Sequence, residues 1–124
     1  IGCPVIASIT GVDLALVITE PTLSGLHDLE RVVRLTDHFG IPAKVVINRY
    51  DININMTRRI EQSVRRLGAE LLGRVRYDPA VTQAQIEGLS VIEHSSDGAA
   101  ADIAAVWRDL HKSLFEHERL ALEA

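Results

Sequence analysis

The sequence predicts an α/β fold in which a parallel sheet of three to four strands carries helices on both faces. Residues 14–19 form a short, continuously apolar run, and residues 43–48 contain the apolar run Val45-Val46-Ile47. Both suit strands covered on both faces, the usual state of a parallel sheet. Longer amphipathic segments separate these runs. Strands that alternate with helices of about ten or more residues form βαβ units with right-handed crossovers.

The first elements are expected to be a short helix and a buried strand. Pro4 suits the first turn of a helix, where its missing N–H costs nothing, and Gly11 suits the position just past the end. The run LALVIT, residues 14–19, is then expected to be the first strand. Pro21 follows it and ends the strand, because proline removes a donor from the strand ladder.

Two helix–strand pairs are expected next. Over about residues 24–39 the apolar residues recur at helical spacing and the charged residues take the opposite face, which predicts an amphipathic helix. The segment AKVVIN, residues 43–48, is the second strand. A second amphipathic helix is expected over residues 56–67, and a third strand over residues 70–77, interrupted by Gly73.

The last third of the chain is expected to hold two helices and a short fourth strand. Asp78 suits the N-cap of a short helix, and Pro79 suits its first position. Val91 and Ile92 form the expected fourth strand. A long final helix, capped by Ser95, Ser96 or Asp97, follows. Its inward face is expected to comprise Ile103, Val106, Trp107, Leu110 and Leu114, which makes Trp107 a core residue.

Composition limits the class of protein. The 124 residues suffice for one domain, and a net charge of −4 gives no global attraction to nucleic acid or to an anionic membrane surface. One cysteine, Cys3, rules out an intrachain disulfide, and the sequence shows no signal peptide or long apolar run, so we expect a cytoplasmic protein without a membrane span. The opening Ile-Gly-Cys-Pro and the exposed edges of so small a sheet predict that further strands precede residue 1.

Polar residues follow each predicted strand at its carboxyl end. Glu20 follows the first strand, Asn48 and Arg49 end the second, and the stretch Arg76-Tyr77-Asp78 ends the third. Parallel strands present their carboxyl ends along one border of the sheet, and in open α/β sheets ligands bind outside that border. The amide of Asn48 offers donors and acceptors that suit a purine edge. The alternative is that Asn48 only caps a turn.

The order of four segments carries a family resemblance. GCPVIASITG, DLALVITEPTLSGLHDLERV, VVINRYD and YDPAVTQAQIEG together resemble the C-terminal half of P-loop ATPases of the MinD, ParA and nitrogenase iron-protein class. The branch of MinD-like ATPases with an inserted ferredoxin domain is the most similar. TEPTLSGLHDLER is the most specific of these pieces, and the resemblance covers nearly the whole chain.

The resemblance implies a nucleotide-binding role. In that family the fold is doubly wound and Rossmann-like, and ATP with Mg²⁺ lies between two protomers of a homodimer. Asn48 matches the asparagine that reads the adenine, with Arg49 beside it. Tyr77, Asp78 and Pro79 match the segment that packs near the base, whereas Arg76 stands where the family commonly has proline. The resemblance therefore implies that residues 1–124 supply base recognition and dimer-forming surface.

The phosphate-binding half of such a domain is missing from the sequence. No G-x-x-x-x-G-K-[ST] segment occurs, so no loop of backbone N–H groups cradles phosphate and no Ser or Thr of that motif holds Mg²⁺. We expect residues 1–124 to be the C-terminal part of a P-loop domain. We expect no ATPase activity from these residues alone, and ATP hydrolysis only in an intact parent protein.

Cys3 has two interpretations. Its position resembles that of a cysteine that ligates a [4Fe-4S] cluster between two subunits of the nitrogenase iron protein, which implies iron–sulfur chemistry and an electron-transfer partner for the parent. Because such clusters usually take four thiolates, one cysteine per chain serves only in a larger assembly. The alternative is a small residue at the start of a helix.

Two other functions stay open on the sequence. Asn48-Arg49-Tyr50-Asp51 resembles the N-K-x-D motif of GTPases, in which the aspartate accepts from guanine, so a GTP-specific P-loop protein is one alternative. The other is a non-catalytic α/β module that binds a protein partner through its open sheet edge and its Leu-rich final helix.

Overall fold

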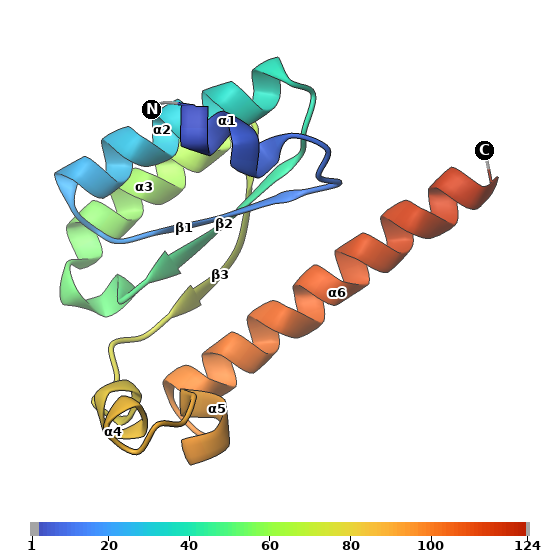
Figure 1. Ribbon diagram of the computed structural model, residues 1–124. Coiled ribbons are helices and arrows are strands. Elements are labelled where there is room, and N and C mark those ends of the chain that lie inside the picture. The colour runs from blue at the N-terminus through green and yellow to red at the C-terminus, as the bar shows by residue number, and fades with distance from the viewer. Residues whose placement is uncertain (1–2, 124) are drawn as a thin grey trace.

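The computed structural model describes residues 3–123, with the side chains of residues 3 and 117–121 left out. Helices and strands alternate along most of this part of the chain (Figure 1). The elements are α1 (Cys3–Ile9), β1 (Ala15–Thr19), α2 (Leu23–His38), β2 (Ala43–Asn48), the 3₁₀ turn η1 (Tyr50–Ile52), α3 (Ile54–Arg66), β3 (Glu70–Val75), α4 (Ala80–Ile86), α5 (Val91–His94) and α6 (Ala99–Glu123).

The sheet is parallel and has the order β1-β2-β3 in the described residues. The central strand β2 is the most buried, since Val45, Val46 and Ile47 are at most 3% exposed. The register between β2 and β3 shifts at Val45 and Val46, where β3 carries one extra residue beside Gly73. The predicted α/β fold with a parallel sheet is confirmed.

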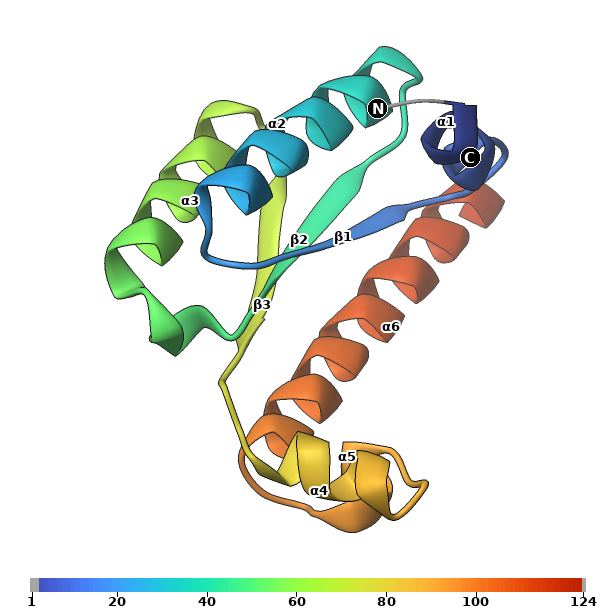
Figure 2. The same ribbon diagram turned by 60° about the vertical axis from the view of Figure 1, so that its left-hand side comes forward.

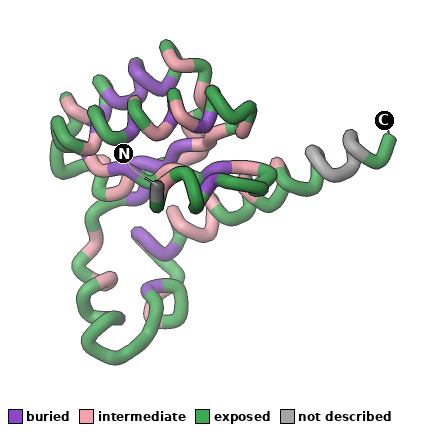
Figure 3. The backbone as a smooth tube through the Cα atoms, turned by 45° about the horizontal axis from the view of Figure 1, so that its top comes forward, coloured by how far each residue is buried: buried purple, intermediate pink, exposed green. Residues whose placement is uncertain are grey.

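Helices cover both faces of the sheet, as predicted. On one face α2 and α3 pack against the sheet, and buried stretches of both helices line that face (Figures 1 and 3). Their core with β2 includes Leu29, Val33, Ile60 and Val64. On the opposite face α6 runs obliquely across the sheet (Figure 2). Burial of these apolar stripes stabilises the layers by about 25 cal/mol per Å² of apolar area removed from water.

Glycine at position 73 lets α6 lie close to β3. A Cβ atom built on Gly73 would stand 2.8 Å from Cγ2 of Val106, which is closer than real Cβ contacts. Val106 and Ile103 pack there against the buried Val46 and Val75. The glycine that interrupts the third strand therefore has a packing role in the contact between sheet and helix.

The predicted fourth strand is wrong. Val91 and Ile92 begin the helix α5, not a strand. Ser90 and Glu93 form a capping box: the Ser90 hydroxyl accepts the Glu93 N–H at 3.3 Å, and Glu93 Oε2 accepts the Ser90 N–H at 2.7 Å. This reciprocal pairing satisfies two donors that a helix start leaves unpaired, so it favours helix over strand.

The predicted core position of Trp107 is also wrong. Its side chain is 59% exposed, although Ile103 and Val106 on the same helix pack against the sheet. Trp107 lies across an open hollow of about 320 Å³ from Leu16 and Ile18 of β1, so no packed surface covers its ring. Trp107 contacts His111 with ring centroids 5.8 Å apart.

Two boundaries differ from the prediction by a few residues. Strand β3 ends at Val75, so Arg76 and Tyr77 lie in the loop that follows it. Helix α4 begins at Ala80, and the backbone of Pro79 is its N-cap. In the described part of the chain, no helix is both long enough and apolar enough to cross a bilayer.

Candidate functional site

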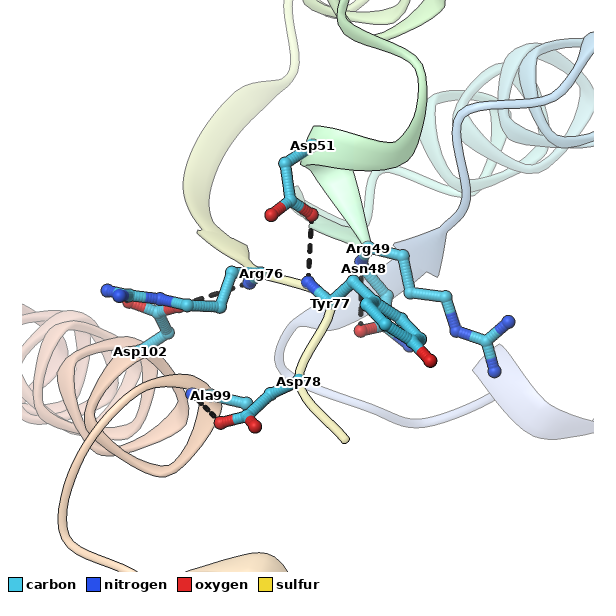
Figure 4. Close-up of polar contacts among 8 residues, drawn as sticks. All are labelled: Asn48, Arg49, Asp51, Arg76, Tyr77, Asp78, Ala99 and Asp102. Carbon is cyan, nitrogen blue, oxygen red and sulfur yellow. Dashed lines mark hydrogen bonds and ion pairs between the residues drawn. The ribbon is translucent and has the colours of Figure 1, made fainter. Parts of the chain in front are cut away.

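The three strands deliver their carboxyl ends to one border of the sheet. Thr19 pairs in register with Ile47, and Asn48 pairs with Val75, so the segments after β1, β2 and β3 leave the sheet together. The prediction that Glu20, Asn48 and Asp78 follow three parallel strands at the same border of the sheet is confirmed. Figure 4 shows how the polar side chains after β2 and β3 gather there.

Asn48 is the last residue of β2 and is half-buried. Its Oδ1 accepts the N–H of Arg49 at 3.1 Å, which fixes the side-chain amide in the manner of a turn cap. Within residues 3–123 no hydrogen bond engages its Nδ2, so the two N–H donors remain available. Asn48 lies where three hollows meet, with cavity volumes of about 320, 440 and 210 Å³.

Arg49 turns the chain sharply after β2. Its backbone has φ 53° and ψ 40°, a left-handed conformation that costs a non-glycine residue roughly 1–2 kcal/mol. The turn points its guanidinium toward Glu20 from the neighbouring loop, with Nε 3.8 Å from the carboxylate. Strain of this kind persists where surrounding structure holds it, and it recurs at binding sites.

Two carboxylates from neighbouring elements fix the loop from Arg76 to Asp78 (Figure 4). Asp51 Oδ1 accepts the Tyr77 N–H at 2.8 Å. Asp102 on α6 accepts the Arg76 N–H at 3.0 Å and pairs with the Arg76 guanidinium through Nε at 2.8 Å and Nη2 at 3.0 Å. The loop is thereby attached to both its neighbours, the turn after β2 and the start of α6.

Asp78 joins the starts of two helices. Its Oδ1 accepts the Ala80 N–H of α4 at 2.9 Å, and its Oδ2 accepts the Ala99 N–H of α6 at 3.0 Å. These two bonds hold the pKa of the Asp78 carboxyl below its ordinary value. The Asp78 carboxylate therefore caps α6, and the predicted cap by Ser95, Ser96 or Asp97 is wrong. The Ser95 hydroxyl accepts the Asp97 N–H, which lies ahead of the helix.

The ion pair between Arg76 and Asp102 shifts the pKa values of both side chains. The hydrogen bonds from the guanidinium hold the pKa of Asp102 below its ordinary value, and the same carboxylate raises the pKa of Arg76. Both side chains are therefore charged at neutral pH. The pair is bidentate, a geometry that fixes the orientation of an arginine as well as its position.

A small cavity lies between the turn after β2 and the loop after β3. It has a volume of about 210 Å³. Apolar and polar groups mix in its wall, as small-molecule sites require. Its lining includes Asn48, Arg49, Val75, Arg76, Tyr77, Asp78, Val81 and Ile103.

The cavity brings together four of the five residues expected to bind nucleotide: Asn48, Arg49, Tyr77 and Asp78. Pro79 does not line this cavity, and it serves as the N-cap of α4 instead. The side chain of Cys3 lies outside the described residues. Among the described residues, no group of three or more His, Cys, Asp or Glu side chains is placed to hold a metal ion.

Comparison with known proteins supports the architecture. No protein-family model matches the chain. The MinD cell division protein of Aquifex aeolicus is structurally similar, with a TM-score of 0.67 and 26% identity over 82% of this chain and 44% of that one. The chain has part of the MinD-like P-loop fold. MinD of Pyrococcus horikoshii, complexed with Mg-ADP, matches 88% of this chain and 45% of that chain with a TM-score of 0.70 and 17% identity.

A ParA family ATPase of Chlorobium tepidum is also structurally similar to this chain, with a TM-score of 0.60 and 19% identity over 86% of this chain and 44% of that one. Two uncharacterized proteins of Methanocaldococcus jannaschii are 37% identical over 51 and 65 residues, which are 41% and 52% of this chain. The chain spans less than half the length of these solved structures, and the two matches cover 19% and 24% of the curated relatives.

Proposed function

We propose that residues 1–124 are the base-recognition part of a MinD-like nucleotide-binding domain, with the Asn48 amide as the reader of adenine. The observation that carries this proposal is the hydrogen bonding of the Asn48 side-chain amide. Its oxygen is engaged by the Arg49 N–H at 3.1 Å, while its nitrogen faces the border of the sheet without a partner in the described chain. A fixed amide with free donors suits the acceptor nitrogens of a purine.

The shape of the neighbouring cavity supports a base as the ligand. Val75 and Val81 supply apolar wall, and Tyr77 supplies an aromatic side chain that is 54% exposed. A flat heteroaromatic ring gains from apolar and aromatic contacts as well as from hydrogen bonds. The similarity in fold to MinD of Pyrococcus horikoshii, which was solved with Mg-ADP, supports a nucleotide as the ligand.

Asp51 favours adenine over guanine. A guanine site of the N-K-x-D kind uses the aspartate after the asparagine as an acceptor for the base. Here Asp51 is directed at the Tyr77 backbone, with its Oδ1 2.8 Å from that nitrogen. A carboxylate that accepts from both N1 and N2 of guanine uses both of its oxygens, so Oδ1 would have to be shared between the base and the Tyr77 N–H.

The proposal for residues 1–124 stops at the base. The residues present do not fit a triphosphate with Mg²⁺, because the sequence has no glycine-rich phosphate loop. ATP hydrolysis and nucleotide-dependent homodimerisation are proposed for the whole gene product in which these residues occur. Light scattering with and without ATP tests the dimer. No feature of the described residues supports an iron–sulfur cluster.

The base proposal is tested by NMR titration of isotope-labelled residues 1–124 with AMP, GMP and ribose 5-phosphate. We expect AMP to shift the Asn48 side-chain amide and the backbone amides of residues 76–78. Ribose 5-phosphate, which lacks a base, should leave these signals in place. Stronger shifts with GMP would support the GTP alternative, and unchanged signals with millimolar AMP would remove the base site.

A further inference from the structure

The loop after β3 is fastened to its surroundings at three consecutive residues. Arg76 bonds to Asp102 of α6, and Tyr77 bonds to Asp51 of the turn after β2. Asp78 accepts the first N–H groups of α4 and α6. Connecting loops are ordinarily more mobile than the helices and strands that they join, so a loop that is bound at three residues in a row is unusual.

The contact between Arg76 and Asp102 engages both the backbone and the side chain of Arg76. One carboxylate accepts the Arg76 N–H at 3.0 Å, Nε at 2.8 Å and Nη2 at 3.0 Å. The Asp102 side chain is 18% exposed, so water competes little for these bonds. A bidentate carboxylate holds a guanidinium in one orientation, and here the same carboxylate also fixes the path of the backbone as it leaves β3.

The ring of Tyr77 takes no part in holding this loop. It is 54% exposed, and among the described residues its hydroxyl makes no hydrogen bond and its ring has no aromatic or cation–π contact. The ring nevertheless lines the cavity of about 210 Å³ together with Asn48 and Arg49. Figure 4 shows the ring on the side of Asn48 and Arg49, whereas the Arg76 side chain points the other way, toward Asp102. The loop therefore combines a fixed backbone with a free aromatic face.

We propose that Asp102 is a positioning residue for the nucleotide base: through Arg76 it holds the Tyr77 ring in the place where this ring stacks on the base. The inference rests on the proposed base site and adds to it a residue of α6. Asp102 does not itself line the cavity, so it acts only through the loop. Aromatic side chains stack on the π-face of any base, and a ring that is already in place binds without the cost of being ordered.

In this arrangement two loops contact the base from different directions. Asn48, at the end of β2, meets its edge, and Tyr77, in the loop after β3, meets its plane. Asp51 ties the two loops to each other, and Asp102 ties the second loop to α6. Without Asp102 the base would have to order the start of the second loop as it binds. The cost of that ordering would appear as lost affinity.

Titration calorimetry of the whole gene product with ATP tests the proposal. Asp102→Ala should weaken ATP binding by about 5- to 30-fold, the cost of fixing the backbone of one residue. Asp109→Ala, at an exposed position further along α6, is the matched control and should leave the affinity unchanged. Asp102→Asn keeps an oxygen that can accept the Arg76 N–H, so its loss should be smaller, and it serves as the second variant if Asp102→Ala does not fold. An unchanged ATP affinity in the Asp102 variants would overturn the proposal.

A double-variant cycle with Tyr77→Ala separates positioning of the ring from a general loss of stability. If Asp102 acts through the Tyr77 ring, Asp102→Ala should weaken ATP binding by less than about twofold once that ring is gone. Additive losses would show that Asp102 does not act through Tyr77 and would overturn the proposal. Asn48→Ala in the same titrations tests the base site itself. A wild-type product that does not bind ATP would remove the base site and this inference together, whereas ATP binding that Asn48→Ala weakens and Asp102→Ala does not would remove this inference alone.

Discussion

Asp51 and Tyr77 are 26 residues apart in the sequence, and a 2.8 Å hydrogen bond from the Tyr77 N–H to Asp51 Oδ1 joins the two loops of the candidate site. Removing the acceptor in Asp51→Ala should release the loop after β3. We expect a stability loss of about 0.5–1.5 kcal/mol, the range of a typical hydrogen bond. We also expect faster hydrogen exchange at the Tyr77 amide, measured by NMR.

Asp51→Asn is the control for this prediction, because the amide oxygen of asparagine can still accept the Tyr77 N–H. It should keep the slow exchange that Asp51→Ala loses. If both variants exchange at the wild-type rate, the loop is held by other contacts, and the role given to Asp51 is wrong.

Gly98, which is half-buried, should resist substitution more than the exposed glycines with positive φ. Its φ is 58°, and a Cβ atom added there would collide with the Asp78 carboxylate that caps α6. Gly98→Ala should therefore lower the free energy of unfolding by the backbone cost of an alanine at positive φ and by the loss of the cap. Gly88 has φ 73° and no atom near an added Cβ, so Gly88→Ala reports the backbone cost alone.

Urea unfolding of the two variants measures the difference. We expect Gly98→Ala to lose about 1 kcal/mol more than Gly88→Ala, the usual value of a helix cap. Equal losses would show that the contact of Asp78 with Ala99 contributes nothing to stability.

The aspartates that hold the loop after β3 should make stability fall in acid. The pKa values of Asp78 and Asp102 are lowered in the folded protein, by backbone N–H bonds and by the Arg76 guanidinium respectively. Their contribution is complete above the ordinary aspartate pKa of about 3.9, because both states are then ionised. As pH falls below about 4 the unfolded chain binds protons first, and the contribution is lost through the lowered folded pKa values.

Urea unfolding between pH 6 and pH 2 checks this prediction. Asp102→Asn should flatten the decline below pH 4, because one of the two groups that bind protons differently in the two states is gone. A decline with wild-type slope in both Asp102→Asn and Asp78→Asn would contradict the assignment.

Gly73 should set the distance between β3 and α6. A methyl group at Gly73 would stand 2.8 Å from Val106 Cγ2, so Gly73→Ala should destabilise by about 1–3 kcal/mol through overpacking. In the double variant with Val106→Ala the opposing methyl is absent. Its stability should be higher than the sum of the two single changes predicts, and strict additivity would rule out the contact.

Most of the fold could be predicted because buried residues are apolar and recur in the sequence at the spacing of a strand or a helix. The apolar runs that became β1 and β2 and the stripes of α2 and α3 report directly which residues lie inside. Val91 and Ile92 gave only two apolar residues, too few for a period. The capping box of Ser90 and Glu93 was the readable signal at that point, and it was missed. The prediction for Trp107 was wrong for another reason. An apolar stripe shows which side of a helix faces the core, but only the packed sheet shows which residues of that side are covered.

The site could be predicted only in its location. Parallel strands necessarily share a border, so Glu20, Asn48 and Asp78 were expected near one another. The bonds of Asp51 to Tyr77 and of Asp102 to Arg76 join residues 26 positions apart, and no local pattern encodes such pairs. Asp51 was considered as a base ligand and proved to hold backbone. Binding itself is a prediction for each of these residues.

The affinity of the whole gene product for ATP, measured by titration calorimetry in wild type and in Asn48→Ala, tests the central claim most directly. Asn55→Ala, at an exposed position on α3, is the matched control. We predict that Asn48→Ala weakens binding by about 1–3 kcal/mol, the cost of unpaired polar groups on a buried base, while Asn55→Ala has no effect. An unchanged dissociation constant in Asn48→Ala would contradict the assignment of Asn48 to the base.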